Sequence, residues 1–299
     1  MLKLRIAKYV GCPLLFVLAG IGAAQSPART AGKFYIVGMG TASDLVTIRG
    51  QRVTAQADVL MAEEEALRTY WADFAKGKEI WEYPHELRRF YGADPKQLPD
   101  PKQRKKAEEL EKLRRELVRK ITSAVESGKV VACLQSGDPM MYGMTLFLEM
   151  LPASVPAEIV PGVGAFQAAS AALKKSPPYG YDTNAVILTM SDWPGRVDRN
   201  EKLMATGSTL VFYTMNLDYP LIFGQLARHY PGETPVAVVC DAGDSKQEQV
   251  IRSTVAAFLN EVDHRNLPPN RHILFVGKFL NVGQVRRDFT PRITGTSDN

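Results

Sequence analysis

Cysteine is scarce in this chain, with three residues in a length of 299. A small disulfide-bonded domain needs more cysteines than this, and their spacing fits no metal site. Cys133 and Cys240 each end an apolar, strand-like run, so we expect two buried thiols that pack as small hydrophobic side chains. The four histidines are also scattered without metal-ligand spacing, and the sequence therefore predicts no metal centre.

A large excess of charge of one sign is also missing. The formal net charge is +5 at pH 7, and the 45% hydrophobic and 23% charged residues are ordinary for a globular protein. Three of the positive charges, Lys3, Arg5 and Lys8, lie close to the N-terminus. Basic side chains in residues 101–127 alternate with glutamates, which is typical of a solvated helix surface. We therefore expect no nucleic-acid partner.

The N-terminal segment has the features of a secretory signal peptide. Residues 1–24 combine a basic start, an apolar stretch from Val10 onward and small residues before Gln25. The apolar stretch contains Pro13 and is short for a membrane span, which needs roughly 20 residues. We expect cleavage after residue 24 and export to the periplasm. Membrane anchoring by an uncleaved signal, or a cytoplasmic protein with a misassigned start, are the alternatives.

Beyond the signal, apolar strand-like runs alternate with helical patterns, which predicts an α/β protein. The proline- and glycine-rich segment 174–183 reads as a linker, so we expect two consecutive α/β domains with mainly parallel sheets. The predicted parts are a linker at 25–32, domains at 33–173 and 184–288, and a tail at 289–299. Predicted strands cover 33–38, 58–62, 78–83, 130–135, 157–162, 185–191, 209–215, 235–240 and 272–278. Predicted helices cover 44–57 with Asp44 as its cap, 101–127, 141–150, 165–173, 200–205, 217–229 and 247–260.

Four predicted strands end in glycine-containing turns, where open α/β sheets bind their ligands. These turns are Gly38–Ser43, Ser136–Pro139, Val160–Phe166 and Cys240–Asp244. The first lacks the third glycine of a dinucleotide fingerprint, which argues against a Rossmann cofactor. In the second, Gly137 permits close approach of a ligand to the backbone. Asp138 can either cap the following turn or accept hydrogen bonds from a ligand.

The order of these motifs resembles the tetrapyrrole methylases, over roughly residues 33–288. The resemblance rests on "DLVTIRGQRVTAQADVL", "SGDPMMYG", "VPGVGAFQAASAAL" and "PVAVVCDAGDSKQEQVIRSTV". Within the family, residues 186–189 and 235–254 are most similar to the precorrin-4 and cobalt-precorrin-4 methyltransferases. The resemblance implies two α/β domains, S-adenosylmethionine in the cleft between them, a tetrapyrrole acceptor and a homodimer. The family positions that bind the cofactor correspond to Ser136, Gly137, Asp138, Met141, Gly164, Ala165, Met215 (or Thr214) and Ala242.

The first glycine turn departs from the family pattern, because it lacks a proline and one glycine and is one residue shorter before Asp44. The resemblance places this turn, with Gly38, Gly40 and Thr41, against the methyl acceptor. Glu63 corresponds to an acidic position of some relatives and is the predicted general base. Arginines suit the carboxylates of a tetrapyrrole; the predicted ones are Arg88, Arg89, Arg196 and Arg199.

Two other functions remain open at this point. The segment 68–106, with its aromatic and arginine residues, would suit a peptide-backbone acceptor, as in a smaller set of relatives. An exported protein that binds a tetrapyrrole or another ligand without catalysis would account for the signal peptide.

Overall fold

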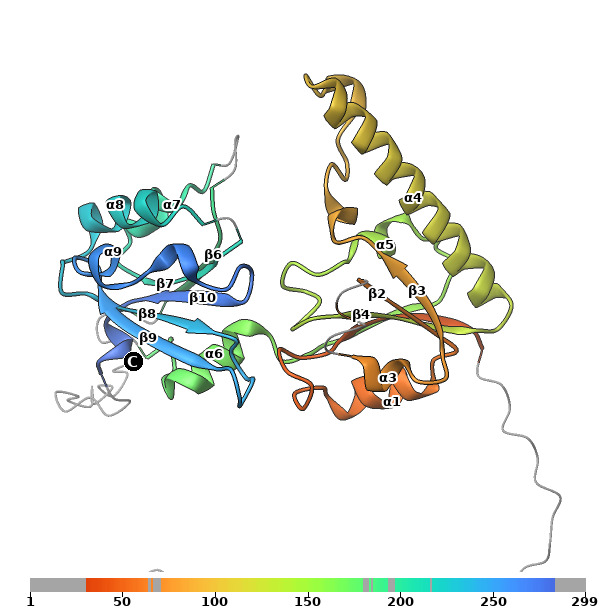
Figure 1. Ribbon diagram of the computed structural model, residues 1–299, viewed down its shortest axis with the longest axis horizontal. Helices are drawn as coiled ribbons and strands as arrows, with labels where there is room; N and C mark the ends of the chain where they lie inside the picture. The colour runs from red at the N-terminus through yellow and green to blue at the C-terminus, as the bar shows by residue number, and fades with distance from the viewer. Residues whose placement is uncertain are drawn as a thin grey trace, which may run out of the picture. The chain divides into compact units, whose positions relative to one another are not determined.

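The computed structural model describes residues 31–63, 66, 71–179, 183, 185–192, 197–215 and 217–282, which form two five-stranded sheets (Figure 1). The predicted signal peptide, the predicted tail and Arg196 lie outside these residues. Within the described part of the chain, no helix is long and apolar enough to cross a membrane.

The first sheet has the strand order β3-β2-β4-β1-β5, and all pairs among its described strands are parallel, which confirms the predicted mainly parallel sheet. Its strands are β1 (Lys33–Gly38), β2 (Val59–Glu63), β3 (Glu79–Tyr83), β4 (Val130–Gln135) and β5 (Ala157–Val160). The helices beside it are α1 (Ile48–Gln56), α3 (Ala72–Ala75), α4 (Pro101–Glu126) and α5 (Leu146–Met150). Figure 1 shows α4 and α5 on one face and α1 and α3 on the other. Successive side chains of β1 point to opposite faces of the sheet, and each face is covered by different helices. Ile36 packs in a cluster with residues of α4, whereas Val37 packs in another cluster with Val53 of α1.

The helix boundaries show where local interactions prevail over the hydrophobic pattern. α4 begins after its cap Asp100, whose Oδ1 accepts from the backbone N–H of Lys102 at 2.8 Å. The prediction that Asp44 caps the first helix was wrong. The cap is Thr47, whose Oγ1 accepts from Gly50 N at 3.0 Å. The helix expected from residue 141 begins only at Leu146, after a turn in which Tyr142 has a φ of 66°.

The second sheet has the order β6-β7-β10-β8-β9. Its strands are β6 (Val186–Thr189), β7 (Thr209–Tyr213), β8 (Pro235–Cys240), β9 (Gln249–Thr254) and β10 (His272–Val276). Its helices are α6 (Ala165–Leu173), α7 (Asn200–Met204), α8 (Tyr219–His229) and α9 (Phe258–Glu261). α7, α8 and α9 lie on one face in Figure 1, whereas Ala169 and Leu173 of α6 pack against the other. α6 precedes the predicted linker, yet its buried residues belong to the core of the second sheet.

The expectation of a mainly parallel second sheet was wrong. Only β6 and β7 pair in parallel among its described strands, while β10 runs antiparallel to both β7 and β8. The predicted helix at 247–260 is instead β9 followed by the short α9. β9 pairs with β8 as a hairpin in the register Cys240↔Gln249, and the turn contains Gly243 with a φ of 88°. A hairpin forces antiparallel pairing, which the apolar spacing alone did not reveal.

Both predicted buried thiols are confirmed as free, buried cysteines. Burial raises the pKa of Cys133 to about 12 and that of Cys240 to about 11, so neither is a reactive thiolate at neutral pH.

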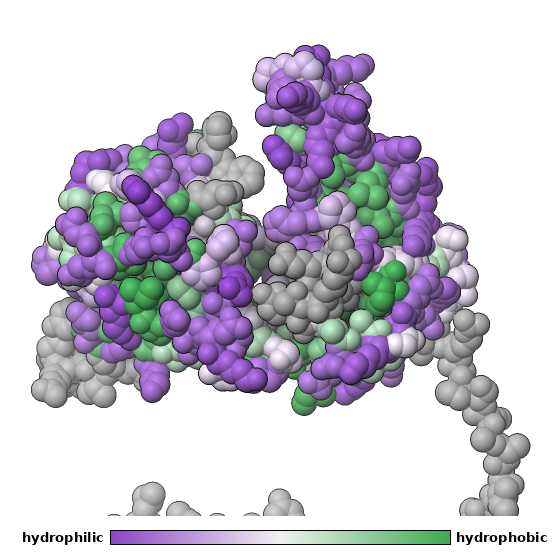
Figure 2. Space-filling view, viewed as in Figure 1, coloured by the Kyte–Doolittle hydropathy of each residue, from purple (hydrophilic) through white to green (hydrophobic). Residues whose placement is uncertain are grey.

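The segment between β3 and α4 is held by a buried arginine. It contains two 3₁₀ turns, η1 (His85–Arg88) and η2 (Pro95–Gln97). Arg114 of α4 is only 1% exposed and donates to Leu87 O at 2.8 Å and Arg89 O at 3.3 Å. Its Nε donates to Glu111, which compensates the buried charge. The N-terminal half of α4 presents mainly hydrophilic side chains (Figure 2), as expected for a solvated helix.

Candidate functional site

The strand ends of the first sheet meet through four glycines, Gly38, Gly40, Gly137 and Gly162, which we call the glycine junction. A Cβ at Gly38 would lie 2.5 Å from Gly162 N, and one at Gly162 would lie 2.2 Å from Gly137 O. Gly40 and Gly137 exchange backbone hydrogen bonds of 3.2 and 2.8 Å. Because backbone packs directly on backbone, no larger residue fits at Gly38 or Gly162 without moving the chain.

Asp138 ties the junction together. Its Oδ1 accepts from Met140 N at 2.8 Å, and its Oδ2 accepts from Gly162 N at 3.1 Å. The carboxylate therefore caps its own turn and also links that turn to the one after β5. The sequence predicted the first contact as one of two alternatives and did not predict the second.

One face of the junction is open. Among the described residues, the nearest atoms to a Cβ at Gly137 would be Gly164 Cα at 3.8 Å and Ala165 N at 3.9 Å. Gly164 precedes α6 and has no side chain with which to cap that helix, and the backbone N–H of Phe166 in its first turn faces the Tyr213 hydroxyl. The structure thus brings the predicted cofactor residues Gly137, Gly164 and Ala165 together around this opening.

Residues of the second sheet reach the same turns. The rings of Tyr142 and Tyr213 meet edge to face with centroids 5.2 Å apart. Burial raises the pKa of Tyr213 to about 12, with smaller contributions from Tyr142 and Asp138, while the backbone N–H of Phe166 opposes the shift. Apart from this contact with the Phe166 N–H, the buried Tyr213 hydroxyl has no hydrogen-bond partner within the described residues. A polar ligand at this point would satisfy it.

The turn after β8 closes another side of the site. Ala242 is buried, and a Cβ at Gly243 would lie 2.5 Å from Leu45 Cδ1 and 2.8 Å from Thr41 Oγ1. Asp241 has a φ of 48°, an uncommon conformation for a residue other than glycine. Aspartate tolerates this conformation in turns, and Asp241 stands at the start of the hairpin turn between β8 and β9.

Met215 and Thr214, the two residues that could correspond to one cofactor-binding position of the family, lie at the end of β7 and differ in burial. Thr214 is buried, and its hydroxyl donates to His272 O at 2.5 Å. Met215 is half-buried. Met141 is also half-buried, whereas Ser136 is exposed.

Two predicted acceptor-binding arginines have structural partners. Arg88 donates to Tyr142 O and, at 3.4 Å, to Gly143 O, and so braces η1 against the turn after β4. Arg89 lies 3.7 Å from Glu86 and stacks over Phe90. Arg199 is exposed just before α7, and Arg196 lies outside the described residues. The bracing role of Arg88 differs from the predicted pairing with a substrate carboxylate.

Glu63 lies at the carboxyl end of β2, level with Tyr83 of β3. Its Oε2 lies 2.8 Å from Nδ1 of His85, which the sequence analysis did not connect with the site. The position of His85 in the sequence could have connected it with the site, because it follows a predicted strand whose carboxyl end lies at the same sheet edge as the glycine turns.

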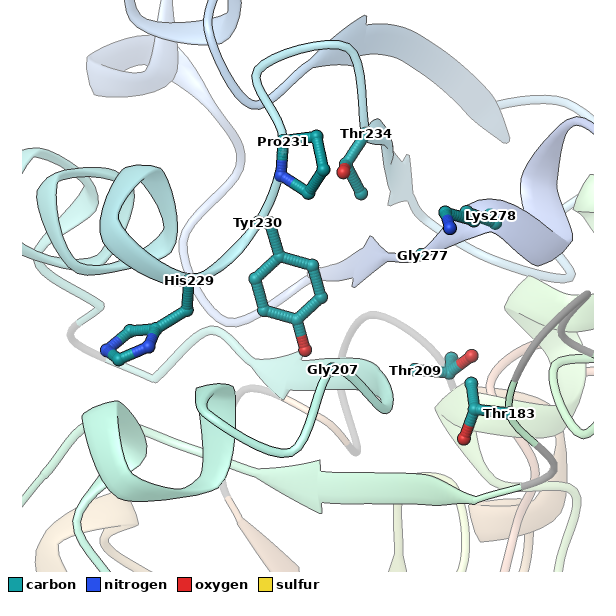
Figure 3. A pocket seen from close by; sticks show the side chains of 9 residues that line it. All are labelled: Thr183, Gly207, Thr209, His229, Tyr230, Pro231, Thr234, Gly277 and Lys278. Atoms are coloured by element: carbon teal, nitrogen blue, oxygen red, sulfur yellow. The ribbon is translucent and has the colours of Figure 1, made fainter.

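A cavity beside the second sheet is separate from this site. It measures about 160 Å³ and lies at the start of β7, where Thr209, Tyr230 and Lys278 are among its lining residues (Figure 3). Tyr213 and the candidate site lie at the other end of the same strand.

Comparison with known proteins identifies the family. The tetrapyrrole (corrin/porphyrin) methylases match over residues 33–258. The chain is 26% identical over 256 residues to a cobalt-precorrin-4 C(11)-methyltransferase of Methanocaldococcus jannaschii, which covers 83% of this chain and 88% of that protein.

Two solved structures have the same fold. One is a cobalt precorrin-4 methyltransferase of cobalamin biosynthesis, with a TM-score of 0.65, 23% identity and coverage of 86% and 99% of the two chains. The other is a uroporphyrin-III C-methyltransferase of Thermus thermophilus in complex with S-adenosylhomocysteine, with a TM-score of 0.58, 20% identity and coverage of 83% and 99%. The chain therefore belongs to the tetrapyrrole (corrin/porphyrin) methylases, and it is an S-adenosylmethionine-dependent methyltransferase, as the order of its glycine motifs indicated.

Proposed function

We propose that this enzyme methylates a corrin precursor of the cobalt-precorrin-4 type. The open face of the glycine junction beside the N-terminus of α6 supports cofactor binding at this point. The match to the Methanocaldococcus jannaschii protein over most of both chains supports the choice of acceptor.

The residues present fit S-adenosylmethionine. Gly137 gives the ligand access to the backbone, and the N-terminus of α6, whose N-cap Gly164 has no side chain, favours its carboxylate. Asp138 and the hydroxyl of Tyr213 offer polar contacts, while Met215 and Ala242 offer apolar ones. When bound, the cofactor supplies an electrophilic methyl group. The enzyme then needs chiefly to hold the acceptor carbon in line and within attack distance.

No observation on the described residues specifically favours a peptide backbone, the other acceptor considered above. The inserted segment does carry aromatic and arginine side chains, but Arg88 and Arg89 are engaged within the fold and Tyr91 donates to Glu149. A corrin precursor therefore remains the acceptor that the comparisons and the site support best.

Incubation of the purified enzyme with cobalt-precorrin-4 and S-adenosylmethionine should add one methyl group to the acceptor. Mass spectrometry of the product, with uroporphyrinogen III as a competing acceptor, measures this. Gly137→Val is the matched inactive control, because valine would fill the open face and is strained at a φ of 68°. Absence of methylation of cobalt-precorrin-4 by the unaltered enzyme would contradict the proposed acceptor.

From the predicted signal peptide we also propose that the mature protein begins near Gln25 and lies outside the cytoplasm. N-terminal sequencing of protein isolated from its native host tests it, and an intact Met1 in the cytoplasmic fraction would exclude cleavage.

The proposed homodimer is a separate prediction. Light scattering at micromolar concentration tests it, and a monomer mass alone would count against it.

A further inference from the structure

An acid–base pair occupies the carboxyl edge of the first sheet. Glu63 Oε2 and His85 Nδ1 lie 2.8 Å apart. A carboxylate accepts, so Nδ1 carries the proton of this hydrogen bond and Nε2 of the neutral ring is left as the basic atom. The side chain of His85 is 70% exposed, against 30% for Glu63. Within the described residues Nε2 has no hydrogen bond, and the imidazole is open to a ligand.

The strand register places this pair beside the glycine junction. Gly38 of β1 pairs with Gln135 of β4, and the pairing of Met61 with Cys133 brings Glu63 level with Gln135 two residues further on. Glu63 therefore lies two strands from Gly38, which is roughly 10 Å at the usual strand spacing. A tetrapyrrole is wide enough to contact both positions at once.

Two arginines hold the backbone that carries His85. Arg114 binds the carbonyls of Leu87 and Arg89 from α4, and Arg88 binds those of Tyr142 and Gly143. The turn to which Arg88 donates is the end of the "SGDPMMYG" motif, and its Tyr142 also contacts Tyr213. These contacts fix η1 to the site rather than leaving it as a free surface loop.

We propose that His85, oriented by Glu63, accepts the proton that the tetrapyrrole loses on methylation; this rests on the function proposed above. An acceptor carbon attacks the methyl group, a C–CH₃ bond forms, and the electron pair of the broken S–CH₃ bond returns to sulfur. The acceptor then carries one positive charge too many and must lose a proton from a conjugated N–H or C–H. Nε2 of His85 takes that proton, and the carboxylate of Glu63 stabilises the resulting imidazolium. Glu63, predicted from sequence as the base itself, becomes the positioning residue.

His85→Ala should lower kcat for methylation of cobalt-precorrin-4 about 100-fold, the lower end of the range for losing a general base. The KM for S-adenosylmethionine and the melting temperature should stay unchanged. Added imidazole should restore turnover in proportion to its concentration, which a merely structural role would not allow. Glu86→Gln is the matched control, because Glu86 follows His85 directly but pairs with Lys106 on the surface.

Glu63→Gln tests the positioning role separately. Nitrogen-15 spectra of the imidazole should show the proton of neutral His85 on Nδ1 in the unaltered enzyme and a mixture of tautomers in the variant. The kcat of this variant should fall less than that of His85→Ala.

The outcomes are distinguishable from failure of the proposed function. An unaltered enzyme that does not methylate cobalt-precorrin-4 overturns that function and this inference together. An active unaltered enzyme with undiminished turnover in His85→Ala, or with a loss that imidazole does not rescue, overturns the assignment of His85 alone.

Discussion

Replacing Gly162 by alanine should abolish binding of S-adenosylmethionine. The added Cβ would lie 2.2 Å from Gly137 O and 2.8 Å from the carbonyl carbon of Gly38. Both neighbours are backbone atoms and cannot rotate away, so the turn after β5 must move away from the ends of β1 and β4. That movement would displace the open face at Gly137 and strain the hydrogen bond from Gly162 N to Asp138. We expect at least a hundredfold loss of affinity, with a cost of about 1–3 kcal/mol in unfolding free energy from overpacking.

Calorimetric titration with S-adenosylmethionine and thermal melting measure the two effects. Gly224→Ala is the matched control, because Gly224 lies within α8 and a Cβ there would meet nothing within 4 Å. That substitution should leave affinity unchanged and raise stability by about 0.5–1 kcal/mol, the usual gain from replacing glycine inside a helix. Binding of normal strength by Gly162→Ala would show that the glycine junction does not shape the cofactor site.

The sequence predicted the first sheet well because its signals are local. Buried parallel strands read as continuous apolar runs, and each ends at a turn residue such as Gly38 or Gly137. The second sheet was predicted less well, since apolar positions in the segment 247–260 fit both a helix and a strand. The partner strand decided between them, as β9 pairs with β8 along its whole length.

The cofactor residues could be placed because they belong to contiguous motifs. The contacts that organise them are long-range and left no local signal. Gly162 N reaches Asp138 across 24 residues, and Arg88 reaches Tyr142 across 54. Arg114 appeared to belong to a solvated basic helix, whereas it is 1% exposed beneath the inserted segment. An arginine in an amphipathic pattern is taken as a surface residue unless the carbonyls that it binds are known.

Asp138→Asn should both destabilise the fold and weaken cofactor binding. Asparagine is an equally good cap for Met140 N. Its single side-chain oxygen cannot also accept from Gly162 N, however, and its amide group would face that N–H as a second donor. Leaving the Gly162 N–H without an acceptor costs about 1–3 kcal/mol. The melting temperature should therefore fall by several degrees. Loss of a charged contact with the cofactor would weaken affinity by about tenfold to a hundredfold.

Asp218→Asn is the matched control, because Asp218 caps a helix but does not join two turns as Asp138 does. Asp218 caps α8 through Oδ1, which accepts from Leu221 N at 3.0 Å, and within the part of the chain that the structure describes neither of its oxygens links two turns. Asp218→Asn should therefore change neither the melting temperature nor the affinity measurably. If Asp138→Asn behaves in the same way, Asp138 is only a cap. If it melts lower but binds S-adenosylmethionine normally, Asp138 supports the junction without touching the cofactor. Both losses together are the expected result, because the carboxylate that joins the turns after β4 and β5 also borders the open face at Gly137.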